Sequence, residues 1–179
     1  MLDAAGYPVK DGKRFTVNLL AAGWFEENGK AGQFVKQSLE DIGIEVNLTV
    51  PDRATSLKLI YNDYDYDIAL SNFASQVEQV PKQTGYFTTD GIVKGAAFRN
   101  GNGYSNPEVD EIVNQMSVET DEAKRVALAH QWQEIVNRDL PITVLVEMQS
   151  TTVSAAKVKG AGNRADIQGD SFSDVWIDG

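Results

Sequence analysis

Three aspartates alternate with two tyrosines over residues 63–67, and carboxylates at such a spacing can act as ligands for a hard cation. A calcium loop of the EF-hand type also needs a glycine in its sharp turn and a later glutamate, and both are missing here. We therefore interpret Asp63, Asp65 and Asp67 as a polar turn that leads into a strand, and we expect no metal site.

Residue types for acid–base or nucleophilic catalysis are sparse. His130 is the only histidine and lies outside any H-x-x-x-H or H-E-x-x-H spacing, which favours a surface or helix-packing role. The spacing of Glu26, Glu27 and Glu78 fixes no distance between carboxylates, so no acid–base pair follows. The chain has no cysteine, no P-loop, no G-x-G-x-x-G and no G-x-S-x-G. We expect no catalytic residue and no cofactor.

Aromatic and polar residues follow two of the expected strands. In open parallel α/β sheets, ligands bind beyond the carboxyl ends of the strands, where aromatic rings form apolar walls and polar groups fix orientation. Packing in the core or at its rim is the alternative for the aromatic residues at 24, 25 and 73. The predicted ligand-binding residues are Trp24, Asn72, Phe73, Ser75, Gln76 and Glu78.

Strand and helix patterns alternate in the first half of the chain. Short apolar or alternating runs predict strands over residues 15–20, 45–50 and 66–73. Apolar residues at helical spacing predict a helix over residues 27–42 that Gly43 ends, and a short helix from an Asp52 cap to Tyr61. This order predicts an α/β fold with a mixed, mostly parallel sheet flanked by helices.

The second half begins with a glycine-rich segment, residues 74–103, whose length and aromatic content favour a functional loop. Helices are predicted over residues 107–118, capped by Asn106 or Ser105 with Pro107 in the first turn, and over residues 121–138, capped by Thr120. A fourth strand is predicted over residues 142–146, and a short apolar piece at 175–177 ends the chain.

Length and charge restrict the class of protein. The 179 residues are enough for one domain, or for one lobe of a larger protein. The formal net charge of −10 argues against nucleic acid and anionic membranes as partners, and we interpret it as a solubility feature. No apolar run approaches the roughly 18 residues of a membrane-spanning helix, and the first residues lack a signal-peptide pattern.

Five short motifs, in this order, resemble the large extracytoplasmic solute-binding proteins of ABC importers for peptides, nickel and related ligands. The resemblance covers almost the whole chain. The motifs are L-D-A-A-G-Y at residues 2–7, L-E-D-I-G-I-E-V at 39–46, Y-D-I at 66–68, Y-S-N-P-E-V-D at 104–110, and Asp121 and Arg125 followed by D-L-P at 139–141.

The resemblance implies a two-lobed protein with a type II periplasmic-binding fold, of which this chain would be the C-terminal part. Residues 1–155 would form most of the second, large lobe, and residues 156–179 a tail crossing back towards the first lobe. The chain would then begin inside a longer protein, which accounts for the missing signal peptide. The implied partners are a peptide or other small solute, an ABC permease and the first lobe, in a monomeric periplasmic or other extracytoplasmic protein, with or without a membrane anchor.

One departure from the family pattern affects the expected solute. In peptide-binding members the third strand is followed by an aromatic residue and, three positions later, by an aspartate that pairs with the α-ammonium group of the ligand. The corresponding residues here are Phe73 and Gln76. A neutral amide cannot form that charge-assisted bond, so an uncharged or differently anchored solute is expected unless Glu78 substitutes.

Two other classes of function stay open at this point. The first is a non-transport interaction module on the same fold, which an apolar patch on a closed lobe face would favour. The second is an α/β hydrolase or transferase, which would need a nucleophile or acid–base set that the sequence does not show.

Overall fold

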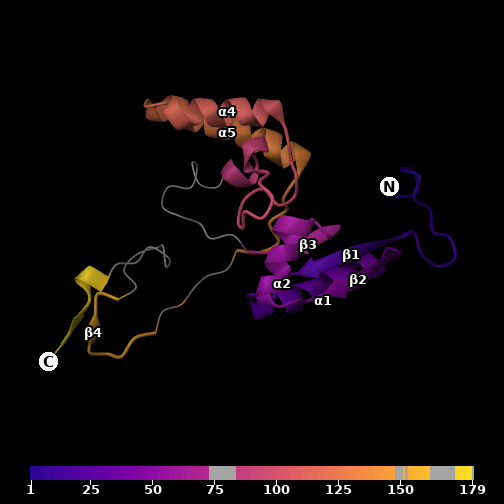
Figure 1. The fold of residues 1–179 in the computed structure, drawn as a ribbon, viewed down its shortest axis with the longest axis horizontal. Coiled ribbons are helices and arrows are strands. Elements are labelled where there is room, and N and C mark those ends of the chain that lie inside the picture. Colours follow the sequence, from indigo (N-terminus) through magenta and orange to yellow (C-terminus); the bar gives the residue numbers. More distant parts are fainter. Residues whose placement is uncertain (73–83, 148–150, 152, 162–171, 179) are drawn as a thin grey trace. The chain divides into compact units, whose positions relative to one another are not determined.

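The computed structural model describes residues 1–72, 84–147, 151, 153–161 and 172–178 (Figure 1). The chain divides into two compact units. Unit 1 contains Met1–Phe73 and Gly85–Asp110, and unit 2 contains Ala74–Thr84 and Glu111–Gly179. No helix in the described part is both long and apolar enough to cross a membrane.

Unit 1 is built on a parallel sheet with the strand order β2-β1-β3 (Figure 1). The strands are β1 (Phe15–Ala21), β2 (Ile44–Thr49) and β3 (Ile68–Leu70). Both β2 and β3 run parallel to β1, so the predicted parallel α/β arrangement is confirmed. β3 is shorter than predicted, because residues 66, 67, 71 and 72 lie outside the strand ladder.

Helix α1 (Glu26–Glu40) connects β1 to β2 and packs against one face of the sheet. Gly32 makes this packing close, because a Cβ atom there would lie only 3.2 Å from Ala21 Cβ. The apolar side chains of α1 pack on buried Leu19, Ile44 and Val46. The helix ends two residues before the predicted Ile42, and the left-handed turn at Gly43, with a φ of 84°, then redirects the chain.

A short helix and a π-helical turn connect β2 to β3: α2 (Arg53–Lys58) and η1 (Leu59–Asp63). As predicted, Asp52 caps α2, since its Oδ1 accepts a hydrogen bond of 2.8 Å from Thr55 N. This bond to the backbone is the main cause that lowers the pKa of the exposed Asp52 carboxyl. Ile60 and Tyr61 of η1 are buried with Leu20 and Ala22, so this connection covers the other face at the carboxyl ends of the strands.

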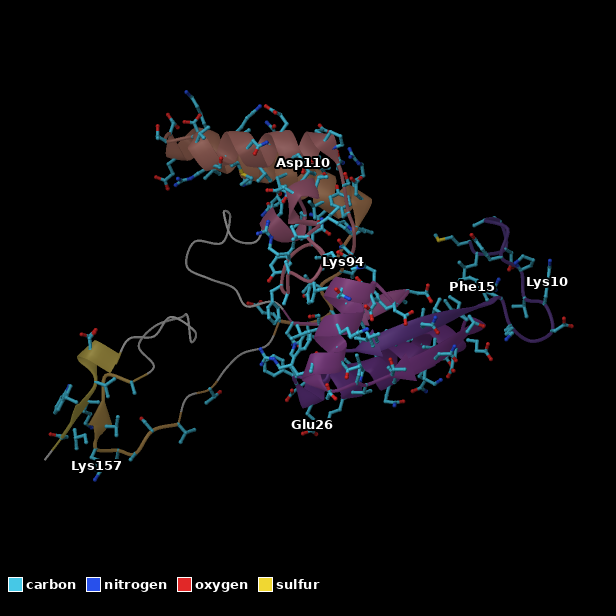
Figure 2. All side chains as sticks on the ribbon, in the orientation of Figure 1. Lys10, Phe15, Glu26, Lys94, Asp110 and Lys157 are labelled. Atoms are coloured by element: carbon cyan, nitrogen blue, oxygen red, sulfur yellow. The ribbon has the colours of Figure 1, made fainter. Side chains whose placement is uncertain are left out.

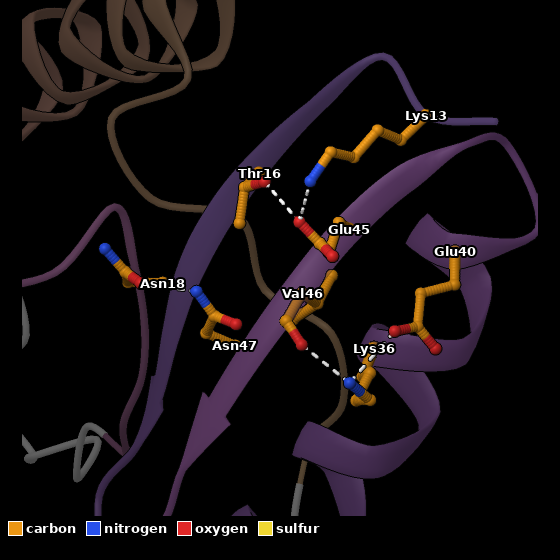
Figure 3. A network of polar contacts seen from close by, with 8 residues as sticks. All are labelled: Lys13, Thr16, Asn18, Lys36, Glu40, Glu45, Val46 and Asn47. Carbon is orange, nitrogen blue, oxygen red and sulfur yellow. Dashed lines mark hydrogen bonds and ion pairs between the residues drawn. The ribbon is translucent and has the colours of Figure 1, made fainter. Parts of the chain in front are cut away.

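Polar side chains from β1 and β2 meet at the opposite end of the sheet (Figure 3). Glu45 accepts bonds from Lys13 Nζ at 2.6 Å and Thr16 Oγ1 at 2.5 Å, and both the hydrogen bonds and the charge of Lys13 lower its pKa.

On α1, Lys36 Nζ donates to the Val46 carbonyl at 2.6 Å and pairs with Glu40 at 2.9 Å. These contacts tie the helix and the loop before β1 to β2.

The two predicted long helices are present as α4 (Pro107–Val118) and α5 (Glu122–Asp139). The bounds of α4 match the prediction, and Asn106 Oδ1 caps it by accepting from Glu108 N at 3.0 Å. The predicted Thr120 cap of α5 is wrong. Asp121 is the cap, because it has an extended backbone and its carboxylate accepts from Lys124 N at 3.1 Å.

The strand predicted over residues 142–146 does not form, which is a second correction. The segment is irregular, and Val144, Leu145 and Val146 are 79%, 55% and 72% exposed. No described strand pairs with it, and a β-type sequence without a partner strand cannot form the hydrogen bonds of a sheet.

The apolar piece near the end forms β5 (Trp176–Ile177), which pairs antiparallel with β4 (Val158–Lys159). Single 3₁₀ turns lie at Thr84–Tyr86 (η2), Thr89–Gly91 (η3) and Phe172–Asp174 (η4).

Candidate functional site

The carboxyl ends of β1 and β3 lie side by side. Ala21 is paired with Leu70, and Ala22 N donates to the Leu70 carbonyl at 2.9 Å. The residues that follow the two strands therefore leave the same edge of the sheet. The structure brings two of the predicted residues, Trp24 and Asn72, to this edge, and both are partly buried. The other four, Phe73, Ser75, Gln76 and Glu78, lie outside the described residues, and ligand binding by all six stays a prediction.

A tight turn after β1 fixes the backbone that carries Trp24. Gly23 N donates to Ser56 Oγ at 3.2 Å, and Ser56 Oγ donates to the Pro51 carbonyl at 3.1 Å. Asn28 Nδ2, which is buried, donates to the Ala22 carbonyl at 2.7 Å. A Cβ atom on Gly23 would lie 2.0 Å from Pro51 O, so only glycine fits between the two segments. The turn is therefore a rigid support for the aromatic residue after it.

Trp24 takes part in a chain of three aromatic rings. Its ring meets Phe98 edge-on at 5.9 Å between centroids and 64° between planes. Phe98 in turn lies 5.9 Å from Tyr61. Trp24 also packs on the buried cluster around Leu20 and Tyr61, so its ring combines core packing with partial exposure. Burial, and secondarily the neighbouring Tyr86, raises the pKa of Tyr61 to about 12, so its phenol is neutral at physiological pH.

Phe98 is not among the site residues predicted from the sequence. It lies in the glycine-rich segment 84–103, and the only sequence signal was the presence of aromatics in a long segment without a period. The left-handed backbone of Phe98, with a φ of 60°, is not predictable from a phenylalanine. Its contact with Trp24 becomes visible only in three dimensions.

The motif at residues 104–110 holds this segment in place. Asp110, at the start of α4 (Figure 2), accepts bonds from Thr89 N at 2.8 Å and from Thr89 Oγ1 at 2.6 Å. Buried Asn100 donates through Nδ2 to the Thr88 carbonyl at 2.9 Å and to the Tyr104 carbonyl at 2.7 Å. The helix start is thus a structural clamp for the loop that presents Phe98.

An open depression adjoins the same edge at the start of α1. Phe25, which is 49% exposed, and Val50, which is 53% exposed, supply its apolar surface. Glu26 and Lys30 also line it and form an ion pair of 2.7 Å; their hydrogen bond is the main cause that lowers the pKa of Glu26 and raises that of Lys30. This surface therefore presents little net charge to a ligand.

Two of the three acidic residues considered as metal ligands, Asp63 and Asp67, have side-chain partners within the fold. Asp63 pairs with Lys58, and Asp67 Oδ2 accepts from Asn18 N at 2.7 Å. Asp65 is held by its backbone, which donates to the Leu59 carbonyl at 3.1 Å. In the part of the chain that the structure describes, no group of three or more potential ligands could hold a metal ion. His130 is exposed on α5.

Comparison with known proteins gives consistent matches. A family model described as bacterial extracellular solute-binding proteins, family 5, middle part, matches residues 1–95. A periplasmic oligopeptide-binding protein of an ABC transporter from Thermotoga maritima is 25% identical with a TM-score of 0.69, over 78% of this chain and 28% of that one. No curated protein sequence gives a significant match.

Two further solved structures share the fold. A candidate peptide-binding protein, AppA from Clostridium difficile, is 20% identical with a TM-score of 0.75 and covers 99% of this chain and 35% of its own. NikA from Staphylococcus aureus, solved with Ni(L-His)2, is 20% identical with a TM-score of 0.64, over 79% of this chain and 29% of that one. The fold is that of the type II periplasmic binding proteins, and the chain spans about a third or less of these proteins.

Proposed function

Because this chain belongs to the bacterial extracellular solute-binding proteins of family 5, we propose that it forms most of one lobe of a two-lobed protein that captures a small solute for an ABC importer. The observation that carries the proposal is the shared sheet edge at which Trp24 and Asn72 follow two parallel strands. Residues 1–155 are the lobe in this proposal, and residues 156–179 are the tail that crosses back to the first lobe. The protein acts outside the cytoplasm as a monomer.

Capture in such a protein is a binding process without a chemical step. The solute lies between two lobes, which close about a hinge, and the closed form is the one delivered to the permease. In our proposal the aromatic rings of Trp24 and Phe73 supply apolar walls. The polar contacts come from Asn72, Ser75, Gln76 and Glu78.

The proposed solute is a peptide or another small molecule, with an uncharged one favoured. The Thermotoga maritima relative is named as oligopeptide-binding and has also been crystallised with mannohexaose. One relative at 25% identity is therefore linked both to oligopeptides and to mannohexaose. Gln76 carries no charge with which to pair an ammonium group. This supports a solute that is held by hydrogen bonds and ring contacts.

The proposal is tested on the full-length protein that carries this chain, purified without refolding. Mass spectrometry of the extract from the denatured protein should identify a small solute at about one per molecule. Calorimetry should then show that this solute binds the emptied full-length protein tightly, and residues 1–179 alone only with a Kd of about 1 mM or weaker, because half of the cleft is absent. Tight binding by residues 1–179, or no solute bound by the full-length protein, would contradict the proposal.

A further inference from the structure

We propose that Phe98 is a solute-contacting residue, and that its ring and that of Trp24 form an aromatic wall that selects an uncharged solute with a flat apolar face, such as a sugar ring. The inference deepens the proposed function and rests on it. It concerns residues of unit 1 only, and Phe98 lies in the glycine-rich segment, away from the strand ends in the sequence.

The backbone of Phe98 is held in an unfavourable conformation by its neighbours. A φ of 60° is rare for a bulky aromatic residue, since Cβ then crowds the backbone. The segment is fixed before Phe98 by Gly95 N, which donates to the Tyr61 carbonyl at 2.6 Å. It is fixed after Phe98 by Asn100, whose backbone N donates to the Gly91 carbonyl at 3.2 Å. The protein thus maintains the strained position from both sides.

The ring gains less burial from this position than a core residue would. Phe98 is 42% exposed, although Tyr61 beneath it is only 4% exposed. Core packing alone would favour a conformation that hides the ring. A strained backbone that keeps an aromatic ring partly in solvent is typical of a site that contacts a ligand. The adjoining ring of Trp24 lies just after β1, at the edge where ligands bind in such sheets.

The arrangement of the rings indicates the class of ligand. The three aromatic residues touch each other in sequence, with 5.9 Å between successive centroids and interplanar angles of 64° and 53°. The rings touch each other directly, so no cation fits between two ring faces, and Tyr61 is buried. The exposed surfaces of Phe98 and Trp24 therefore form an angled wall and not an aromatic cage. A β-linked glucose ring, whose hydroxyls are all equatorial, has two apolar C–H faces, one of which can lie on the exposed Phe98 ring while its edge contacts Trp24. Its hydroxyls remain available for polar groups such as Asn72, which follows β3.

The test uses saturation-transfer NMR, which detects millimolar binding, on the full chain of residues 1–179. The probes are cellotetraose, trialanine and tetramethylammonium, each added separately. The variants are Phe98→Leu, which keeps an apolar side chain without a ring, and Phe34→Leu, a control at a phenylalanine of α1 that is 71% exposed. We expect transfer to the ring protons of cellotetraose in the wild type and in Phe34→Leu, and at least a fivefold loss in Phe98→Leu.

Circular dichroism checks that each variant folds. If Phe98→Leu does not fold, Phe98→Gly replaces it, because glycine accepts the positive φ without strain. The inference is overturned if cellotetraose gives no transfer, or if transfer is the same without the Phe98 ring. Stronger transfer to tetramethylammonium than to cellotetraose would contradict the aromatic wall and indicate a cation site. Transfer to trialanine that persists in Phe98→Leu, with none to cellotetraose, would overturn the inference while supporting solute capture.

Discussion

At the scale of single residues, Gly23 determines how the chain leaves the central strand. Its missing side chain lets the Pro51 carbonyl approach, and Ser56 bonds both segments at once. Two separate parts of the sequence, the turn at Gly23 and residues 51–56, thus meet next to Trp24. The candidate site depends on this turn, because a displaced turn would move the Trp24 ring off the cluster on which it packs.

Gly23→Ala should lower the free energy of unfolding by about 3 kcal/mol, because the added Cβ would lie 2.0 Å from a backbone oxygen that cannot move aside cheaply. Urea unfolding followed by circular dichroism measures the change. Gly29→Ala is the matched control. Its Cβ would make only an ordinary contact of 3.5 Å with Val50, and alanine favours the helix, so a gain of up to about 1 kcal/mol is expected. Equal effects of the two substitutions would contradict the steric explanation.

Residue patterns predicted part of the candidate site. Trp24 and Asn72 could be located because strand ends are visible in the pattern of apolar residues, and parallel strands bring their carboxyl ends to one edge. Phe98 could not be located, since its place beside Trp24 depends on a backbone conformation that phenylalanine rarely adopts. Long-range contacts of an irregular segment leave no periodic signal in the sequence.

At the scale of elements, the start of α4 fixes the position of the η3 turn. Asn106 caps the helix locally, whereas Asp110 in its first turn reaches Thr89, which is 21 residues earlier in the chain. The Y-S-N-P-E-V-D motif therefore encodes two kinds of contact, the first within the helix and the second with the glycine-rich segment. Only the first was evident from the sequence.

Asp110→Ala should destabilise the chain by about 1 kcal/mol, because it removes both bonds to the exposed Thr89. Asp110→Asn retains one acceptor oxygen and should cost about half as much. Amide hydrogen exchange gives the local readout: the Thr89 N–H should exchange faster in both variants, more so in the alanine. Glu108→Ala, in the same turn of α4, is the control and should leave that amide unchanged; faster exchange there would contradict a specific Asp110 contact.

Regular elements were more predictable than their ends. The β1, β2, α1 and α4 predictions are confirmed to within two residues, because their apolar spacing and caps are local properties of the sequence. The cap of α5 was displaced by one residue, since adjacent Thr120 and Asp121 both suit that position and only the backbone distinguishes them. The strand at residues 142–146 failed because a strand needs a partner, which no local pattern can supply.

At the scale of the whole molecule, the apolar segment at residues 144–146 and the net charge of −10 act in opposite directions on solubility. The exposed segment is rich in β-branched residues and joins no strand in the described part of the chain, so it is suited to pairing with other copies. The excess of acidic residues makes the copies repel each other. The chain should remain soluble as long as the repulsion acts over the distance between molecules.

Salt should therefore promote association of the isolated chain. Raising sodium chloride from about 20 mM to about 500 mM shortens the screening length, so light scattering at 37 °C should increase with time in the wild type. The double substitution of Val144 and Val146 by threonine keeps the charge and should reduce the scattering severalfold. Val153→Thr, at a residue that is 90% exposed outside this segment, is the control and should change little. Scattering that is independent of the double substitution would place the association elsewhere.

The strand order has a consequence for how the chain is made. The central strand β1 is synthesised first, and its two neighbours follow at residues 44–49 and 68–70. At roughly 5–20 residues per second, the ribosome needs on the order of one to a few seconds to add the connection between β2 and β3. During that interval, one side of β1 carries unpaired amide and carbonyl groups while the other is already paired. Nascent chains of this protein should therefore expose a one-sided parallel edge until β3 has been added.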